Sequence, residues 1–457
     1  MIKLAQYGCH RPDLLNLELI ENLKHLKENA PSHSFKETEK ILKDNQIYDK
    51  IVEIDKNPIA SGIIGQVYRA KIIQDDGSVK DVALKVRHPK ILQNMNLDLH
   101  IIYAITNVLS KVSFLKWIRV PVTYEECQSI LINQTDFRIE GNNTNKFYNN
   151  FYHLNKMIEI PKIYYQSEDV LVEEFMVDSL NVGEYIDKKD LKVNKRLAQI
   201  GINLFLKMLI YDNFIHADCH SGNIFVKKLN KNHENNNNIL IHYKQRLDAM
   251  IYEVAKLVEY QLFKVYTFFF EMRQEKDPTN LPSIAERIKN LNKQYYQDLV
   301  QSAHEVIKSD SLEQNYSLVL LDCGMVTQLS QNDHKSIIKL VKAIITKDPV
   351  QSSINIQRMS TCDNKINYDY FQKDLEVIFQ QIVDIPLQNI NFGQMINQIV
   401  MKAQERKIVI NASAAFLLSN IVVLEGLAKS LDPDVNIIGQ ALPYLINKRV
   451  VKYIFQE

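Results

Sequence analysis

The stretch His216-Ala-Asp-Cys-His-Ser-Gly-Asn-Ile-Phe-Val226 decides the fold of this chain. It follows a long apolar run, Ile200–Phe214, which predicts a buried helix. Its own last residues are apolar and predict a short strand. An acid, Asp218, and an amide, Asn223, therefore stand in a loop between two buried elements. This loop is the first candidate for a functional site.

The spacing of Asp218 and Asn223 matches the H-R-D-x-x-x-x-N loop of protein kinases. In that loop the Asp orients or deprotonates the attacking hydroxyl group, and the Asn holds a magnesium ion. The neighbouring His216 and His220 could suggest a zinc pair instead. A third zinc ligand is not evident, and the Asp/Asn spacing already has an explanation, so we favour the magnesium interpretation.

Two segments upstream fit the same interpretation. In Ala60-Ser-Gly-Ile-Ile-Gly-Gln-Val67, glycines let the backbone approach phosphates, and Val67 can cover a purine base. Val82-Ala-Leu-Lys85 places a lysine inside the next apolar strand, where it could hold the α- and β-phosphates. Taken singly, the glycines could serve packing and the lysine could be a surface residue. The candidate nucleotide contacts in these segments are Ala60, Ser61, Gly62, Gly65, Val67 and Lys85.

Two more segments extend the set. Leu318-Val-Leu-Leu-Asp-Cys-Gly324 delivers an acid from an apolar strand, as D-F-G does, so Asp322 is a candidate magnesium ligand beside Asn223. Val170–Phe175 predicts a strand that runs into a hinge, where backbone groups from Glu174 to Met176 would meet the adenine edge. The segments occur in the order found in protein kinases. They therefore predict a site for ATP and Mg²⁺.

A carboxylate should pair with the lysine to complete this site. Glu140, on a helix that precedes the next pair of strands, is the candidate. Glu125 and Glu126, at the start of that helical pattern, are alternatives. The candidate catalytic residues are therefore Asp218, Lys85 and Glu140.

The composition indicates a globular and mostly helical protein. Of 457 residues, 46% are hydrophobic and 24% are charged, and only 12 Gly and 12 Pro argue against a chain of many tight turns. A net charge of +1 gives no broad electrostatic footprint for nucleic acid. The odd number of cysteines and the lack of C-x-x-C argue against a disulfide framework. No apolar run is long enough for a transmembrane helix, and Ile410–Leu424 predicts a buried helix.

The pattern along the chain predicts an α+β, protein-kinase-like fold with two lobes. We expect a helical extension over residues 1–50, an N-lobe with a small mixed sheet over 51–177, and an α-rich C-lobe over 178–457. Asp-Gly within Gln74–Ser78, between two extended segments, predicts a hairpin in the N-lobe.

Residues 230–316 are predicted to form an insert within the C-lobe. The polar tract Asn235–Asn238 marks its beginning, and Arg246–Arg273 and Pro282–Ile307 predict a helical hairpin. This hairpin could be a satellite bundle packed on the body of the protein. A protein-binding arm and a contact with a membrane surface are the alternatives.

Together these segments resemble the UbiB-like atypical kinases, also called aarF-domain-containing kinases. The most specific carrier is His216–Asn223, where the family has H-A-D-x-H-P-G-N. Lys3-Leu-Ala-Gln6 and Arg11-Pro-Asp-Leu14 resemble the family's K-x-G-Q and R-P-D-L segments. Pro58–Val67 stands where most members have an alanine-rich loop. The resemblance covers the chain apart from the insert.

The resemblance implies roles for single residues. Lys85 would contact phosphate with Glu140 as its partner, Asp218 would be the catalytic-loop acid, and Asn223 and Asp322 would bind magnesium.

It also implies that Lys3 and Gln6 belong to an extension that folds over the site and occludes a protein substrate. Family members resemble ATPases or small-molecule kinases that support coenzyme Q biosynthesis. We therefore expect a small-molecule or lipid-related substrate and a mitochondrial location, although no transit peptide is visible in this sequence.

Several positions depart from the family pattern. Ala5 replaces the glycine of K-x-G-Q, and Ser221 replaces the proline of H-P-G-N. Gln134–Asp136 stands where most members have E-x-D, and Gly62-Ile63 replaces alanine and serine. The last two departures resemble a divergent mitochondrial branch of the family.

Three functional hypotheses remain open on these residues. The first is a magnesium- and ATP-dependent enzyme that acts on a small or lipid-related substrate, or on water. The second is a protein kinase acting in trans, which needs a segment ending in A-P-E that does not follow Gly324. The third is a non-enzymatic, nucleotide-binding scaffold that holds partners through its insert.

Overall fold

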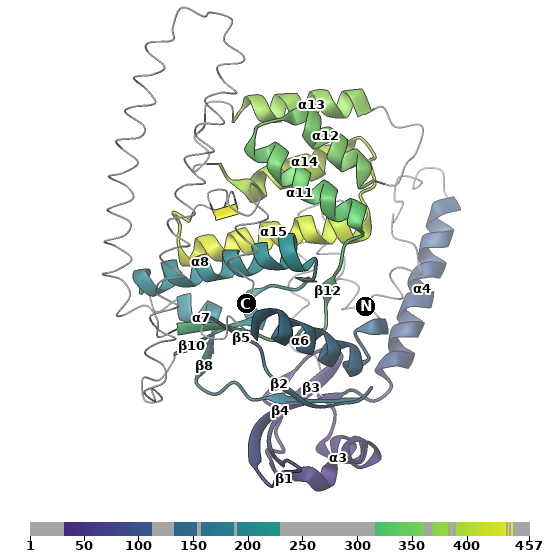
Figure 1. Ribbon diagram of the computed structural model, residues 1–457. Coiled ribbons are helices and arrows are strands. Elements are labelled where there is room, and N and C mark those ends of the chain that lie inside the picture. Colours follow the sequence, from purple (N-terminus) through teal and green to yellow (C-terminus); the bar gives the residue numbers. More distant parts are fainter. Residues whose placement is uncertain are drawn as a thin grey trace, which may run out of the picture.

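The structure is a computed structural model that describes residues 32–111, 132–152, 157–186, 190–228, 316–360, 368–382, 385, 390–435, 437 and 440–441. The predictions for Lys3 and Gln6 lie outside the described residues, as does the predicted hairpin of the insert. Figure 1 shows a small sheet lobe at the lower end and a helical lobe above it, as expected for a bilobal α+β fold.

The N-lobe is an antiparallel sheet in the order β1-β3-β4-β7-β6, with β2 paired to β3. Every pairing in it is antiparallel. Short links join β3 to β4 and β6 to β7, as antiparallel neighbours allow, whereas β4 and β7 are paired although more than 80 residues separate them. The predicted hairpin joins β3 to β4, and Gly77 takes a φ of +80° in its turn. The strands are β1 (Ile51–Ile54), β2 (Ala60–Ser61), β3 (Gly65–Ile73), β4 (Val79–Arg87), β6 (Ile163–Gln166) and β7 (Val170–Glu174).

One face of this sheet forms its own hydrophobic core. Side chains alternate across a strand, so Val82, Leu84 and Val86 of β4 all point to the same face, and all three are fully buried. Helix α3 (Phe35–Asp44) covers that face and begins with a capping box between Ser34 and Glu37. The other face, which carries Lys85, is left for the space between the lobes.

The C-lobe contains a second sheet, in the order β5-β11-β10-β8. The pairing of β5 with β11 is parallel, so the expected mixture of strand directions occurs here and not in the N-lobe sheet. A two-stranded pair, β9 with β12, lies beside the loop that follows β9. The strands are β5 (Ile158–Glu159), β8 (Ser179–Asn181), β9 (Ile215–His216), β10 (Ile224–Lys228), β11 (Tyr316–Leu320) and β12 (Val326–Thr327).

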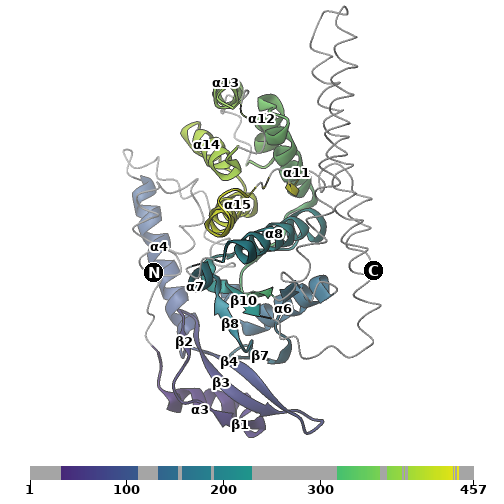
Figure 2. The same cartoon turned by 90° about the vertical axis from the view of Figure 1, so that its left-hand side faces the viewer.

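Helices complete the two lobes. In both views α6 lies between the N-lobe sheet and α8, and α4 extends from the N-lobe along the side of the molecule (Figures 1 and 2). The helices are α4 (Ile91–Lys111), α6 (Phe137–Phe151), α7 (Val182–Ile186), α8 (Leu191–Lys207), α11 (Gln331–Ile345), α12 (Pro349–Arg358), α13 (Tyr368–Gln380), α14 (Phe392–Glu405) and α15 (Ala412–Leu431).

Helix α15 is the expected buried helix. By length and composition it could cross a membrane, but 61% of its apolar stretch is buried inside the protein. It packs against α8 and α14 in the larger of two separate hydrophobic cores. Because the smaller core belongs to the N-lobe sheet, the candidate site lies where two independently packed lobes meet.

Candidate functional site

Lys85 is the centre of a cluster of acidic side chains. Its Nζ lies 2.8 Å from both carboxylate oxygens of Glu140 and 3.6 Å from Oδ2 of Asp322. The side chains of Lys85 and Glu140 are 15% and 5% exposed, whereas that of Asp322 is 51% exposed. The cluster is therefore closed on the side of Glu140 and open to solvent on the side of Asp322.

Three elements bring these side chains together. Lys85 occupies an outward position of β4, Glu140 lies in the first turn of α6, and Asp322 follows β11. Asp136 caps the start of α6 by accepting a hydrogen bond from the backbone N–H of residue 138, which fixes where the helix begins. Asp322 takes a left-handed φ of +52°, a conformation that aspartate tolerates better than most residues.

The charges of the cluster support one another. Burial opposes the ammonium form of Lys85 most strongly, but the nearby carboxylates of Asp322 and Glu140 outweigh it and raise the pKa of Lys85 above its ordinary value. Lys85 is therefore a permanent cation in the cleft. A fixed cation of this kind can bind phosphate oxygens.

The loop from His216 to Asn223 is held in place by hydrogen bonds to the His216 ring. His216 is fully buried, accepts a hydrogen bond from the Asp218 backbone N–H at 3.2 Å, and donates through Nε2 to the Leu321 carbonyl at 3.2 Å. Burial lowers its pKa, which favours the neutral ring that this arrangement needs. Both ring nitrogens thus make hydrogen bonds within the fold. His216 therefore stabilises the loop and has no nitrogen left to bind zinc.

Asn223 and Asp322 lie at neighbouring ends of two paired strands. β10 and β11 pair with Ile224 opposite Leu320, and the Leu321 N–H donates to the Asn223 carbonyl at 2.9 Å. The Asn223 side chain donates Nδ2 to the carbonyl of Asp218 at 3.0 Å. Its amide oxygen accepts no hydrogen bond from any described residue, so it is available to a cation.

These two residues fit a magnesium ion. Mg²⁺ prefers oxygen ligands and is usually held by one or two carboxylates together with phosphate oxygens and water. Asp322 and Asn223 supply a carboxylate and an amide oxygen next to the cation Lys85. Among the described residues no group of three or more His, Cys, Asp and Glu side chains converges as a complete metal site.

The glycine loop between β2 and β3 is tightly held. Gly62 N–H donates to the Gly65 carbonyl at 2.9 Å, and a Cβ on Gly65 would lie 3.1 Å from the ring of Phe137. Ala60 pairs with Val67, which itself faces the cleft opposite Lys85, whereas Ser61 pairs with Gln66 on the other face.

A hydrogen-bonded relay anchors this loop to the N-lobe. His88 donates its backbone N–H to the Ile64 carbonyl at 2.8 Å and its Nε2 to the Gly62 carbonyl at 2.9 Å. Its Nδ1 then accepts from Nδ1 of His33 at 2.7 Å, and His33 Nε2 accepts from the Thr38 hydroxyl at 2.9 Å. The chain of bonds needs neutral histidines, and burial with the neighbouring His88 lowers the pKa of His33 to about 4.

The predicted hinge lies between the lobes. Glu174 donates its backbone N–H to the Lys162 carbonyl, and its side chain accepts from the Lys162 N–H at 3.3 Å. The Met176 carbonyl accepts from the Ser179 hydroxyl at 2.7 Å. Its N–H has no partner among the hydrogen bonds of the described residues and can meet an adenine edge, while Glu174 contributes through the backbone.

Sequence reasoning missed Glu173. In β7 it pairs with Ala83, two residues from the pair of Leu171 with Lys85, so it shares the cleft-facing side. Burial raises its pKa to about 8, and the carboxylates of Glu140 and Asp322 add to the rise. Side chains alternate between the two faces along Val170–Glu174, so Glu173 could have been identified from the sequence once Leu171 was placed on the same face as Lys85.

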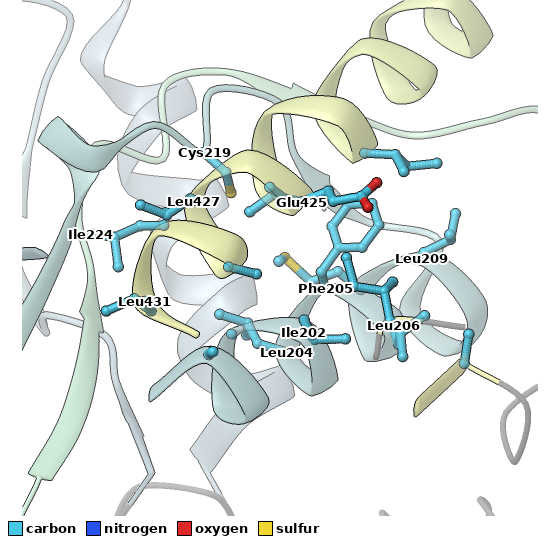
Figure 3. A pocket seen from close by; sticks show the side chains of 18 of the residues that line it. Ile202, Leu204, Phe205, Leu206, Leu209, Cys219, Ile224, Glu425, Leu427 and Leu431 are labelled. Carbon is cyan, nitrogen blue, oxygen red and sulfur yellow. The ribbon is translucent and has the colours of Figure 1, made fainter. Parts of the chain in front are cut away.

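An apolar cavity of about 70 Å³ lies under the His216–Asn223 loop. Its walls come mainly from α8 and α15, and Cys219 of the loop and Ile224 at the start of β10 also line it (Figure 3). Glu425 lies at its edge, where its carboxylate accepts from the Gly393 N–H and pairs with Lys429 at 2.7 Å. The cavity borders the site through residues adjacent to Asp218 and Asn223.

The chain matches two family models. An "ABC1 atypical kinase-like domain" matches residues 25–243, and a "UbiB helical domain" matches residues 375–436. The first range contains Lys85, Glu140, Asp218 and Asn223. The second contains α14 and α15, whose buried residues belong to the C-lobe core.

Curated relatives align with almost the whole chain. It is 30% identical to a probable serine/threonine-protein kinase, abkC, of Dictyostelium discoideum, over 99% of this chain and 63% of that protein. It is 26% identical to a mitochondrial ABC1 family protein of Schizosaccharomyces pombe, over 97% of this chain and 63% of that protein. It is 23% identical to a probable protein kinase UbiB of Histophilus somni, over 98% of this chain and 68% of that protein. The chain thus spans less than two thirds of the first two relatives.

Proposed function

The chain belongs to the UbiB-like atypical kinases, and from this premise we propose that it binds ATP with magnesium and transfers the γ-phosphoryl group to an acceptor hydroxyl or to water. The observation that carries this proposal is the pairing of Lys85 with Glu140 at 2.8 Å, beside Asp322 at 3.6 Å. A buried lysine held between carboxylates is suited to binding phosphate, since its charge is fixed and its position is set.

Each residue of the site has a role in this proposal. Lys85 binds the α- and β-phosphates, and Glu140 holds it in place. Asp218 accepts the proton of the attacking hydroxyl, so that the γ-phosphoryl group passes to the oxygen and ADP leaves. Asn223 and Asp322 hold the magnesium ion, which neutralises charge on the phosphates. The Met176 N–H meets the adenine edge.

We propose a small or lipid-related acceptor instead of a protein. The chain passes from Gly324 through β12 and enters α11 at Gln331, which leaves only a short segment between them. A protein kinase uses a longer segment there, ending in A-P-E, to receive a peptide. The apolar cavity beside the Asp218 loop supports an acceptor with an apolar part.

The place of this activity is proposed from the relatives. The Schizosaccharomyces pombe relative is described as mitochondrial, and the resemblance to UbiB-like proteins supports a role in coenzyme Q or lipid metabolism. The paired ends Lys228 and Tyr316, from which residues 229–315 depart, favour a second candidate function. In it the chain is a nucleotide-binding scaffold whose insert holds a protein or membrane partner.

Thermal melting of the purified chain with ATP or ADP, with and without Mg²⁺, tests the proposal. A ligand that binds the native state raises the melting temperature by mass action. We expect a magnesium-dependent rise that disappears in Asp322→Asn. Asp374→Asn, which removes a carboxylate that contacts Arg406 outside the site, is the matched control and should keep the rise.

Turnover separates the two candidate functions. Release of ADP that is lost in Asp218→Asn, with nucleotide binding retained, supports the enzyme. Binding without any turnover, unchanged by Asp218→Asn, supports the scaffold. The absence of a nucleotide-dependent rise in the wild-type chain contradicts both.

A further inference from the structure

Glu173 is an acidic side chain on the cleft-facing side of β7. Paired residues of antiparallel strands face the same side, and Glu173 pairs with Ala83 while Leu171 pairs with Lys85. Val170 and Val172 point the other way and are fully buried in the N-lobe core. The register therefore directs the Glu173 carboxyl into the same cleft as Lys85.

Its place along the strand lies between the two ends of the proposed nucleotide site. Two strand residues span about 7 Å, so Glu173 lies that far from Leu171 and immediately before the Glu174–Met176 hinge. A nucleotide with its phosphates at Lys85 and its base at the Met176 N–H would bring the base, and not the phosphates, next to Glu173.

The carboxyl of Glu173 is set among like charges. The charged groups that act on it are Lys85 of β4, Glu140 of α6 and Asp322 after β11. Burial raises its pKa to about 8, and Glu140 adds to this, while Lys85 opposes it. Among the hydrogen bonds of the described residues, none involves its side chain. The Glu173 side chain is only partly buried, so its carboxyl is accessible to a ligand in the cleft.

A protonated carboxyl has a defined hydrogen-bonding pattern. It offers one O–H donor and one carbonyl acceptor side by side. The N7/N6 edge of adenine presents one acceptor and one donor, which match that pair. The corresponding edge of guanine presents two acceptors, N7 and O6, which leave the carbonyl without a donor.

We propose that Glu173 reads the N7/N6 edge of the base and strengthens the selectivity of the cleft for adenine over guanine nucleotides. This inference rests on the nucleotide site proposed above and adds a specificity-determining residue to it. It also assigns to β7 a contact with N7 of the base, which Lys85 is too far along the cleft to make. The Met176 N–H can itself favour adenine, because N1 of adenine accepts a hydrogen bond whereas N1 of guanine carries a proton, so N7 is the atom that isolates the role of Glu173.

Equilibrium titrations of the full chain with ATP, GTP and 7-deaza-ATP, each with Mg²⁺, test the proposal. We expect the wild-type chain to bind ATP at least about tenfold more tightly than GTP, as one matched pair of hydrogen bonds allows. 7-deaza-ATP lacks the N7 acceptor and should bind several-fold more weakly than ATP. This comparison needs no variant, so it stands even if a substitution impairs folding.

Two substitutions separate reading of the base from simple packing. The amide of Glu173→Gln keeps one donor and one acceptor and should keep the preference for ATP. Glu173→Met fills the same space without them, and ATP and 7-deaza-ATP should then bind within about threefold of one another. Equal binding of ATP and 7-deaza-ATP by the wild-type chain, or an unchanged preference between these two in Glu173→Met, overturns the role of Glu173 but leaves the nucleotide site. If no nucleotide binds the wild-type chain, both proposals fall.

Discussion

At the scale of single residues, Lys85 faces more negative charge than it can balance. Glu140 and Asp322 both contact it, and Glu173 lies on the same face of the sheet. The rise in the pKa of Glu173 relieves part of this imbalance, because a carboxyl that keeps its proton carries no charge. A divalent cation at Asp322 would relieve more of it. The two carboxylates beside one lysine therefore carry a net negative charge, which suits the cation that we propose.

Removing Glu140 should destabilise the protein and weaken nucleotide binding. Glu140→Ala leaves the ammonium of Lys85 buried without its closest partner, and breaking a buried ion pair costs about 3 kcal/mol. Urea denaturation measures this cost. Asp374→Ala removes a more exposed partner of Arg406 and should cost at most about 1 kcal/mol. Equal effects of the two substitutions would contradict the special role of Glu140.

At the scale of elements, the glycine loop depends on a neighbouring helix. The relay from Thr38 of α3 through His33 and His88 ends on the Gly62 carbonyl. Each histidine ring has one donor and one acceptor in this relay, so a proton added to either ring breaks a bond. The proposed phosphate end of the site therefore depends on hydrogen bonds from two histidines outside it.

The relay predicts a loss of stability at acidic pH. The pKa of His33 is lowered to about 4 in the folded protein against 6.5 in the unfolded chain, so the unfolded chain binds more protons between these values. The contribution of the neutral His33 ring to the free energy of unfolding is complete above pH 6.5. It falls by about 2 kcal/mol as the pH decreases towards 4. His33→Asn should flatten this part of the profile of unfolding free energy against pH. A variant as acid-sensitive as the wild type would show that His33 is not responsible.

Two helix glycines should respond in opposite ways to substitution by alanine. Gly201 lies inside α8 at the apolar cavity, where a new methyl group would meet only Leu318 at 3.8 Å. Gly201→Ala should stabilise the protein by about 1 kcal/mol, since alanine favours a helix. Gly393→Ala would bring a methyl group within 2.6 Å of Glu425 and 3.3 Å of the Val422 backbone. It should lower the melting temperature by separating α14 from α15.

At the scale of the whole molecule, two hydrophobic cores define the two lobes, and the pairing of β10 with β11 joins the ends of the segment between them. The N-lobe and C-lobe cores are separate, which leaves the cleft between them for the polar cluster. Residues 229–315 leave and re-enter the C-lobe at Lys228 and Tyr316, which are paired in one sheet. The sheet therefore joins the two ends of this segment directly.

Replacing residues 229–315 by a short Asn-Gly turn should preserve the fold and nucleotide binding. The entropic cost of closing a loop falls by roughly 0.6 kcal/mol each time the loop is halved in length. Shortening this segment should therefore not lower the free energy of unfolding through loop closure. Thermal melting with and without Mg-ATP measures both properties. A shortened chain that fails to fold would show that the insert packs as part of the C-lobe core.

The local sequence was sufficient for several of the elements and for the candidate site residues other than Glu173. Two extended segments around the Asp-Gly turn predicted the β3–β4 hairpin, because these signals arise within a few residues. The apolar runs Ile200–Phe214 and Ile410–Leu424 predicted buried helices that overlap α8 and α15, although α8 ends at Lys207 and a π-helical turn, Met208–Asp212, follows it. Spacing within the His216–Asn223 loop and the order of the motifs predicted the family and its bilobal fold.

Only the tertiary structure decided which of these residues meet. Glu140 contacts Lys85 because α6 begins at Phe137 and packs across β7, far from β4 in the chain. His216 reaches Leu321, and Glu173 shares a face with Lys85, through strand register that no short stretch of sequence specifies. Local patterns set the chemistry available to each element. The relative placement of the elements, fixed by packing between distant segments, set which groups act together.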